Sequence, residues 1–282
     1  IDKYIDIRMH NVTLQFNSGF GLTVGGDYTY YVSDNEQNML AKYQEGRQSS
    51  ITMIGEQKID RYSIYADQKH SLSKGWSLGY GASYRLVNDR DFQTYSKVTG
   101  NINPSNTYSN LQEQTTDFYA SLSKNFAAGL SMTLSATAEH YSIRDYQKWA
   151  IYPQVSLTYS KTHKHTFQLS LTIDKTYPSY WEMQSTVSYL NGYSELWGTP
   201  GLKPSASYNL NGSYILKRKY IFNLFFMHAL DFFAQTPYQS TERLALIYKN
   251  TNWNYMQSWG ANAIVPFNVG SRLNSRLTLT GM

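Results

Sequence analysis

The sequence predicts an all-β fold, namely an antiparallel up-and-down transmembrane β-barrel of about twelve strands. Long segments alternate between apolar and small polar residues, and 26 of the 282 residues are tyrosine. The mean hydropathy is −0.50, and no run of about 18 apolar residues occurs. Barrels have these properties because only alternate strand residues face lipid, while Tyr and Trp gather where the wall meets the membrane surfaces.

The clearest hairpin runs from Phe118 to Glu139. Segments 118–126 and 130–139 both alternate apolar residues with Ser, Thr or Asn, and the turn 127–130 joins them. Successive side chains of a strand point to opposite faces, so each segment has one apolar and one hydrophilic face. The hydrophilic face is small and polar rather than charged, which indicates a water-filled lumen.

Further strands are predicted by the same alternation over 12–16, 76–86 and 167–174. Many are about ten residues long, enough to cross a bilayer when tilted. Tight turns and longer polar stretches separate them, as at the two ends of an outer-membrane barrel. The predicted short turns are 17–20, 73–76, 127–130, 161–164, 217–219 and 267–271, and the predicted long loops are 33–50, 88–112 and 176–204.

The strand over 220–232 has one irregular feature. His228 interrupts its apolar face, so either this residue lies in the interfacial belt or the register slips at a bulge. We favour the interface, because amphipathic rings are enriched there.

Several classes of function are excluded or disfavoured by composition. The chain has no cysteine, so disulfides and thiolate metal sites are absent. The net charge is +5, but the one basic cluster, 217–219, suits a short turn at a membrane surface better than a nucleic-acid footprint. His163 and His165 lack the further ligand that a metal site needs. Glu139 and His140 point to opposite faces, and no catalytic motif occurs, so we expect no enzyme, cofactor or bound metal.

One loop carries a family signature. The segment Gly198-Thr199-Pro200-Gly201-Leu202-Lys203-Pro204-Ser205 resembles the Gly-Asn-Pro-x-Leu-Lys-Pro-Glu/Ser motif that precedes a barrel strand in TonB-dependent outer-membrane receptors. Thr199 stands where Asn is usual. The flanks 177–183 and 209–226 resemble the outer-membrane β-barrel family common in Bacteroidota, and the resemblance is firmest over 151–233.

This resemblance implies a location in the bacterial outer membrane and a larger barrel of about 22 strands. Residues 1–282 would form a partial barrel, because the chain starts without a signal peptide and ends on an open strand, and it shows no plug and no closing aromatic strand. The resemblance further implies a receptor that imports a solute, with energy from a TonB-type complex acting through the plug. Expected partners are outer-membrane lipid, the solute and that complex, and no nucleic acid.

Three other interpretations stay open from the residues alone. They are a passive porin, an outer-membrane adhesin that binds a partner with its loops, and a soluble β-sandwich. The sandwich is disfavoured by strand length, by Tyr content and by a charged fraction of only 16%. The substrate cannot be derived from the sequence.

Three groups of candidate site residues follow. The aromatic residues of the longest loop are expected to contact ligand, with a rim girdle as the alternative: Tyr177, Tyr180, Trp181, Tyr189, Tyr193 and Trp197. Charges expected to face the lumen are Arg85, Asp174, Arg243, Lys249, Arg272 and Arg276. The residues of the family motif are Gly198, Pro200, Leu202, Lys203 and Pro204.

Overall fold

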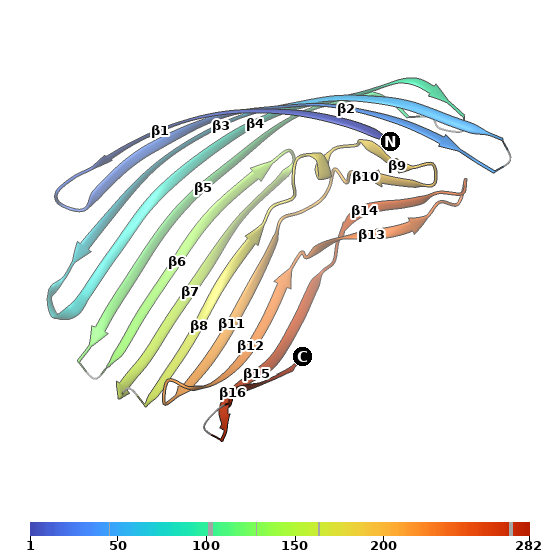
Figure 1. Ribbon diagram of the computed structural model, residues 1–282. Helices are drawn as coiled ribbons and strands as arrows, with labels where there is room; N and C mark the ends of the chain where they lie inside the picture. Colours follow the sequence, from blue (N-terminus) through green and yellow to red (C-terminus); the bar gives the residue numbers. More distant parts are fainter. Residues whose placement is uncertain (45, 101–103, 128, 163, 271–272) are drawn as a thin grey trace.

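The computed structural model describes residues 1–44, 46–100, 104–127, 129–162, 164–270 and 273–282. Twelve strands form one curved antiparallel sheet, called the wall here, in the order β1-β2-β3-β4-β5-β6-β7-β8-β11-β12-β15-β16 (Figure 1). Each strand pairs with the neighbouring wall strands in the sequence, and β1 and β16 form the two edges. The predicted up-and-down antiparallel barrel wall of about twelve strands is confirmed.

The first half of the wall has the longest strands, and the second half has shorter ones. Their bounds are β1 Asp2–Asn17, β2 Leu22–Lys42, β3 Gln48–Ser71, β4 Trp76–Thr99, β5 Thr107–Phe126, β6 Leu130–Ile143, β7 Tyr146–Thr162, β8 His165–Thr176, β11 Ser205–Leu216, β12 Tyr220–Leu230, β15 Tyr255–Val269 and β16 Leu273–Gly281. Two single-turn 3₁₀ helices are η1 Ser73–Gly75 and η2 Trp181–Met183. Among the described residues, no helix is long and apolar enough to cross a membrane.

Four more strands make a second sheet, called the mouth sheet here. They are β9 Val187–Asn191, β10 Ser194–Trp197, β13 Phe233–Gln239 and β14 Leu246–Asn252, in the order β13-β14-β10-β9. Figure 1 shows this sheet beneath the long-loop ends of β1 to β4, inside the curve of the wall. This arrangement matters for function, because it places loop residues inside the mouth of the barrel.

The connections between wall strands do not alternate in length as regularly as predicted: those over 177–204 and 231–254 are long, whereas the β6–β7 connection at the same end is only 144–145. Consecutive strands flank all six expected turns, for example between Asn17 and Leu22 and between Leu216 and Tyr220, but β15 continues to Val269 within the last of them. Residues 128, 163 and 271, which belong to three of these predicted turns, lie outside the described residues. Two of the three predicted long loops are wrong, because β2 continues to Lys42 and β4 to Thr99. The alternation fades there because those strand ends lie beyond the lipid, where an outward side chain need not be apolar.

The outward face of β4 shows where the lipid-facing band ends. From Trp76 to Leu86 this face is apolar or aromatic, over about ten residues, the length that crosses a bilayer when tilted. Asn88 and Arg90 follow on the same face, and an Arg90 Nη2 atom lies 3.0 Å from an Asp60 oxygen on β3. This change from apolar to ion-paired residues marks the outer limit of the apolar band.

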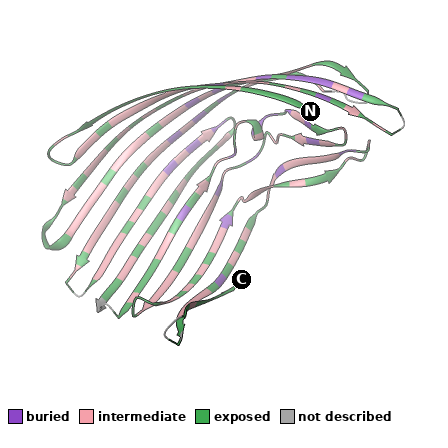
Figure 2. Cartoon of the chain, viewed as in Figure 1, coloured by how far each residue is buried: buried purple, intermediate pink, exposed green. Residues whose placement is uncertain are grey.

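Beyond that limit the inner face changes in the opposite sense, from polar to apolar. Buried apolar residues gather at the long-loop end of the strands, where Figure 2 shows most of the purple segments. One cluster contains Met39, Ile51, Met53 and Tyr189, and the other contains Tyr141, Ile143, Met183 and Leu202. Both clusters join wall strands to residues of the longest loop, so the core of this chain lies between the wall and the segments folded inside it.

The irregular strand β12 pairs without any shift of register from Ile221 to Leu230. This unbroken pairing excludes the slip at a bulge. His228 Nδ1 lies 3.0 Å from Gln257 Nε2, and its ring centroid is 5.9 Å from that of Tyr255. This mixed polar and aromatic surrounding agrees with the interfacial position that we favoured.

Candidate functional site

Two segments between wall strands fold back together at the mouth of the wall. The first, 177–204, called the mouth segment here, contains η2, β9 and β10, and the second, 231–254, contains β13 and β14. They are joined because β10 pairs in parallel with β14, with Ser194 opposite Leu246 and Trp197 opposite Lys249. The mouth segment is also fixed to the wall, since Gln37 Nε2 on β2 donates to the Tyr189 carbonyl at 3.2 Å.

The family motif anchors this arrangement, beginning with Gly198. A Cβ atom at Gly198 would lie 1.9 Å from the Gln184 carbonyl oxygen, so only glycine fits the close approach of the two chain segments. Its N–H donates to the Thr186 carbonyl at 3.0 Å. The carbonyl of Pro200 accepts a 3.2 Å hydrogen bond from Arg144 Nη1 in the β6–β7 connection.

The second half of the motif joins the core and the mouth sheet. Leu202 is 5% exposed and packs in the cluster with Tyr141 and Met183. The Lys203 N–H donates to Asn252 Oδ1 at 2.8 Å, and Asn252 Nδ2 donates to the Lys203 carbonyl at 3.1 Å. Pro204 directly precedes β11, where its restriction of the preceding residue to extended geometry suits a strand start. The motif therefore stabilises the inward fold of the loop.

Two carboxylates on the inner wall bind the start of the mouth segment. Glu139 on β6 is 2% exposed and accepts a 2.7 Å hydrogen bond from the Tyr177 hydroxyl. Lys175 Nζ forms an ion pair with the same carboxylate. Because a buried charge is costly unless it is paired and hydrogen-bonded, these two contacts offset the burial of the Glu139 carboxylate and fix Tyr177 against the wall.

Glu113 on β5 plays the same part for Tyr180. It is 6% exposed and accepts hydrogen bonds from the Tyr180 hydroxyl at 3.1 Å and the Tyr141 hydroxyl at 3.3 Å. Arg85 Nη2 lies 3.7 Å from the second carboxylate oxygen. Burial, together with the nearby carboxylates, raises the pKa of the Tyr177 and Tyr180 hydroxyls, so both stay protonated and donate at physiological pH.

Asp89 is a further buried acid beside this region, beyond the apolar band of β4. Its side chain is fully buried, and Gln57 Nε2 donates to one of its oxygens at 2.8 Å. The second oxygen has no hydrogen-bond partner among the described residues. Burial raises the pKa of Asp89 to about 6.

The outer surface of the mouth contains a cavity of about 400 Å³. The β2–β3 connection, the β9–β10 turn and the β13–β14 connection build it, and its lining includes Tyr43, Tyr193 and Arg243. The Tyr43 and Tyr193 rings meet edge to face with centroids 5.2 Å apart, and the Tyr43 hydroxyl donates to the Gly192 carbonyl at 3.1 Å. An aromatic cavity of this size suits part of a small organic ligand.

Arg243, which lines this cavity, is held in place by an ion pair with the buried Glu195. Glu195 on β10 is 2% exposed and receives both terminal guanidinium nitrogens of Arg243, the Nη2 contact being 2.7 Å. Trp197 Nε1 donates to the same carboxylate at 2.9 Å. The carboxylate raises the pKa of Arg243 and keeps it charged. Glu195 thus positions both an aromatic and a cationic side chain at the mouth.

The structure divides the six predicted ligand-contact aromatics into two groups. Tyr177 and Tyr180 are hydrogen-bonded to the wall, and Tyr189 is 5% exposed within the core. The exposed group has fractional exposures of 43%, 49% and 36% for Trp181, Tyr193 and Trp197 respectively. Ligand contact stays a prediction, and this second group is available for it.

The six predicted lumen-facing charges also divide. Three lie on wall strands: Arg85 donates to Thr115 Oγ1 at 3.1 Å, Asp174 accepts from Asn209 Nδ2 at 2.9 Å, and Arg276 lies on β16. Arg243 and Lys249 do not belong to the wall, because the loop that carries them folds into the mouth sheet. Arg272 and the candidate metal ligand His163 lie outside the described residues.

Sequence reasoning missed Glu113, Glu195 and Tyr43 as parts of the site. A carboxylate on the inner face of a strand was the available signal for Glu113. Glu195 and Tyr43 gave none, because the pairing of β10 with β14 and the approach of the β2–β3 connection join segments far apart in sequence.

Comparison with known proteins gives a consistent result. A family model described as the outer membrane protein beta-barrel family matches residues 14–282. Comparison with curated proteins found no match. Three solved structures of similar fold are a siderophore receptor, a hemophore receptor and a ferric enterobactin receptor.

The siderophore receptor PirA from Acinetobacter baumannii has a TM-score of 0.62 at 13% identity, covering 99% of this chain and 44% of PirA. The hemophore receptor HasR from Serratia marcescens, solved with its hemophore and heme, has a TM-score of 0.63 at 9% identity, covering 99% and 48%. The ferric enterobactin receptor PfeA from Pseudomonas aeruginosa has a TM-score of 0.60 at 13% identity, covering 99% and 43%. The chain thus spans less than half the length of each receptor, and at these identities the likeness concerns the fold.

Proposed function

Because this chain belongs to the outer membrane protein β-barrel family, we propose that it forms part of the barrel of an outer-membrane receptor that imports a solute. Its location is the bacterial outer membrane. The rest of the protein would supply the remaining strands and a plug, through which a TonB-type complex provides energy. A source in Bacteroidota and the absence of any catalytic role or cofactor belong to the same proposal.

The observation that carries this proposal is the inward fold of segments 177–204 and 231–254. Buried contacts between Glu139 and Tyr177, and between Glu113 and Tyr180, hold segment 177–204 inside the wall, and the pairing of β10 with β14 joins segment 231–254 to it. A passive pore needs an open lumen, whereas a receptor needs a shaped surface at its outer end. The cavity beside Tyr43 and Tyr193 is such a surface.

The solute is expected to contact the mouth rather than the lower lumen. Exposed rings at Trp181, Tyr193 and Trp197 offer apolar area at low entropic cost. The similar receptors, by their names, bind a siderophore, ferric enterobactin, or a hemophore with heme. These ligands supply probes for the first experiment.

The test is uptake of ferric enterobactin and of heme by cells that carry the full-length protein, with the gene for TonB present or deleted. Uptake that requires both the protein and TonB is the expected result. The Tyr193→Ala variant is expected to lower binding, whereas Tyr238→Ala, at an exposed tyrosine that does not line the mouth cavity, is the matched control.

Two outcomes would replace the proposal. Steady open-channel conductance of the purified full-length protein in planar bilayers, with uptake independent of TonB, would establish a passive porin. Retention of a ligand at the cell surface without uptake would establish an adhesin or binding protein.

A further inference from the structure

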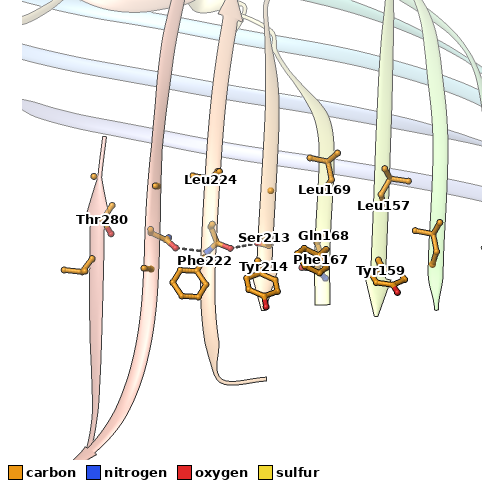
Figure 3. A pocket seen from close by; sticks show the side chains of 18 residues that line it. Leu157, Tyr159, Phe167, Gln168, Leu169, Ser213, Tyr214, Phe222, Leu224 and Thr280 are labelled. Carbon is orange, nitrogen blue, oxygen red and sulfur yellow. Dashed lines mark hydrogen bonds between the residues drawn. The ribbon is translucent and has the colours of Figure 1, made fainter. Parts of the chain in front are cut away.

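The lipid-facing surface near the short turns contains a row of aromatic rings. Tyr159, Phe167, Tyr214 and Phe222 lie side by side on β7, β8, β11 and β12, as Figure 3 shows. The centroids of Phe167 and Tyr214 are 4.6 Å apart, and those of Tyr214 and Phe222 are 6.2 Å apart. These rings line an apolar groove of about 930 Å³, together with leucines such as Leu157, Leu169 and Leu224.

The hydrogen bonds next to this row establish which face it occupies. Ser213 and Asn223 directly neighbour Tyr214 and Phe222 in sequence, and they bond to each other across the sheet. Asn223 Nδ2 also donates to Asn262 Oδ1 at 2.7 Å, and Figure 3 shows these two hydrogen bonds as dashed lines. Since successive side chains point to opposite faces, the hydrogen-bonded residues Ser213, Asn223 and Asn262 face the lumen, and the aromatic row faces lipid.

A cluster of basic residues adjoins the short-turn end of the groove. The β7–β8 and β11–β12 turns touch, because the Lys217 N–H donates to the Lys164 carbonyl at 2.5 Å. The side chains of Lys164, Lys217, Arg218 and Lys219 are exposed. Lys219 Nζ lies 5.5 Å from the ring centroid of Tyr220, which begins β12. In the described part of the chain, no carboxylate forms an ion pair with these three lysines.

The β11–β12 turn holds two non-glycine residues in a backbone conformation that normally favours glycine or asparagine. Lys217 and Arg218 have φ angles of 53° and 55°, in the left-handed region. A two-residue hairpin turn with two positive φ angles prefers Asn-Gly, which adopts them at little cost. Backbone strain that a simpler sequence would relieve points to a role for the side chains themselves.

We propose that this end of the wall binds an anionic phospholipid. The phosphate headgroup would contact Lys164, Lys217 and Lys219, and the acyl chains would lie in the groove along Leu157, Leu169 and Leu224, on the side of the aromatic row away from the turns. Basic clusters beside apolar membrane-facing surfaces select anionic headgroups by charge, while the acyl chains contribute apolar contact. Short turns lie on the periplasmic side of outer-membrane barrels, so the ligand is a lipid of the inner leaflet. This proposal depends on the membrane location and not on transport.

The test is native mass spectrometry of the full-length protein in detergent, titrated with phosphatidylglycerol or with phosphatidylcholine of the same acyl chains. We expect tighter binding of phosphatidylglycerol. The double variant Lys217→Asn, Arg218→Gly creates the favoured turn sequence and should fold normally. It should weaken phosphatidylglycerol binding about 5-fold, the contribution expected of the one headgroup contact that it removes, Lys217.

Lys74→Asn is the matched control. Lys74 is also a basic turn residue with positive φ, at 58°, but it lies in the β3–β4 connection, away from the groove. Equal binding of the two lipids, or an equal effect of Lys74→Asn and of the double variant, would overturn the proposal.

Two further measurements distinguish an anionic phospholipid from other ligands of the groove and the turns. Displacement of the lipid by millimolar inorganic phosphate would mean that the turns bind an anion without the groove, and would overturn the proposal. A protein dimer that forms as lipid is removed, and that Phe167→Ala abolishes, would assign the groove to a second copy of the chain. Loss of lipid binding in monomeric Phe167→Ala would support the proposal.

Discussion

The hydrogen bond between Tyr177 and Glu139 is predicted to hold the mouth segment in place. Tyr177→Phe removes a 2.7 Å bond to a carboxylate whose side chain is 3% exposed. A hydrogen bond to a charged group contributes about 1.5–3 kcal/mol. Because Lys175 still pairs with Glu139, we expect a value near the lower end, about 1.5 kcal/mol.

Tyr180→Phe should cost less. Its 3.1 Å bond to Glu113 is longer, and Tyr141 and Arg85 continue to serve that carboxylate. We expect about 1 kcal/mol. The two tyrosines contact different carboxylates, so their effects on local opening should add to about 2.5 kcal/mol in the double variant.

Native-state hydrogen exchange of the full-length protein measures this opening. Amides of β9 and β10 should exchange about 10-fold faster in Tyr177→Phe and about 60-fold faster in the double variant, since 1.4 kcal/mol corresponds to about a factor of ten. Tyr238→Phe is the control, because its hydroxyl lies 3.0 Å from Thr251 Oγ1 at an exposed position. Exchange in Tyr177→Phe no faster than in the control would refute the assigned role of the buried carboxylates.

Two further predictions concern buried charge. Arg243→Ala removes both guanidinium contacts of the buried Glu195, which keeps its hydrogen bond from Trp197, and should destabilise the mouth sheet by about 3 kcal/mol. Arg90→Ala, which breaks the exposed pair with Asp60, should cost less than about 1 kcal/mol, and equal effects of the two variants in denaturant titrations would contradict this prediction. The pKa of Asp89 is about 6 in the folded protein, above its ordinary value of 3.8. The contribution of Asp89 to folding stability is therefore complete below pH 3.8 and is lost as the pH rises through about 6. Asp89→Asn should therefore stabilise the protein at pH 7.5, by up to about 3 kcal/mol, and make little difference at pH 3.5; a stability difference that did not change with pH would contradict the assignment.

The wall was predictable because one rule governs it. In segments 76–86 and 118–139, a side chain that faces lipid must be apolar, and its neighbour faces water, so sequence period and structure agree. The turn at 217–219 was recognisable because three consecutive basic residues interrupt this alternation. The use of Lys and Arg in place of Asn-Gly at its two positive φ angles was not predictable. Strand bounds beyond the lipid, such as Lys42 and Thr99, were not predictable, because the rule no longer applies there.

The candidate site was only partly predictable. The motif around Gly198 pointed to the correct loop, but the inward fold depends on contacts between residues far apart in sequence, such as Glu113 with Tyr180 and Glu195 with Arg243. An aromatic residue at a rim and one packed in a core look alike in sequence. For that reason Tyr189 and Tyr193, four positions apart, could not be separated before the structure placed one in the core and the other at the mouth.

The central claim is that the apolar face of the wall faces lipid and the polar face lines the lumen. Leu224 and Asn223 are adjacent on β12 and point to opposite faces, with Leu224 67% exposed. Unfolding of the full-length protein from lipid bilayers, compared for Leu224→Arg and Asn223→Arg, tests the claim directly. We expect Leu224→Arg to destabilise by about 2–4 kcal/mol. Asn223→Arg should destabilise by less, because it places the charge in the water-filled lumen and loses only the hydrogen bonds with Ser213 and Asn262. Equal or reversed effects would contradict the assignment of the two faces.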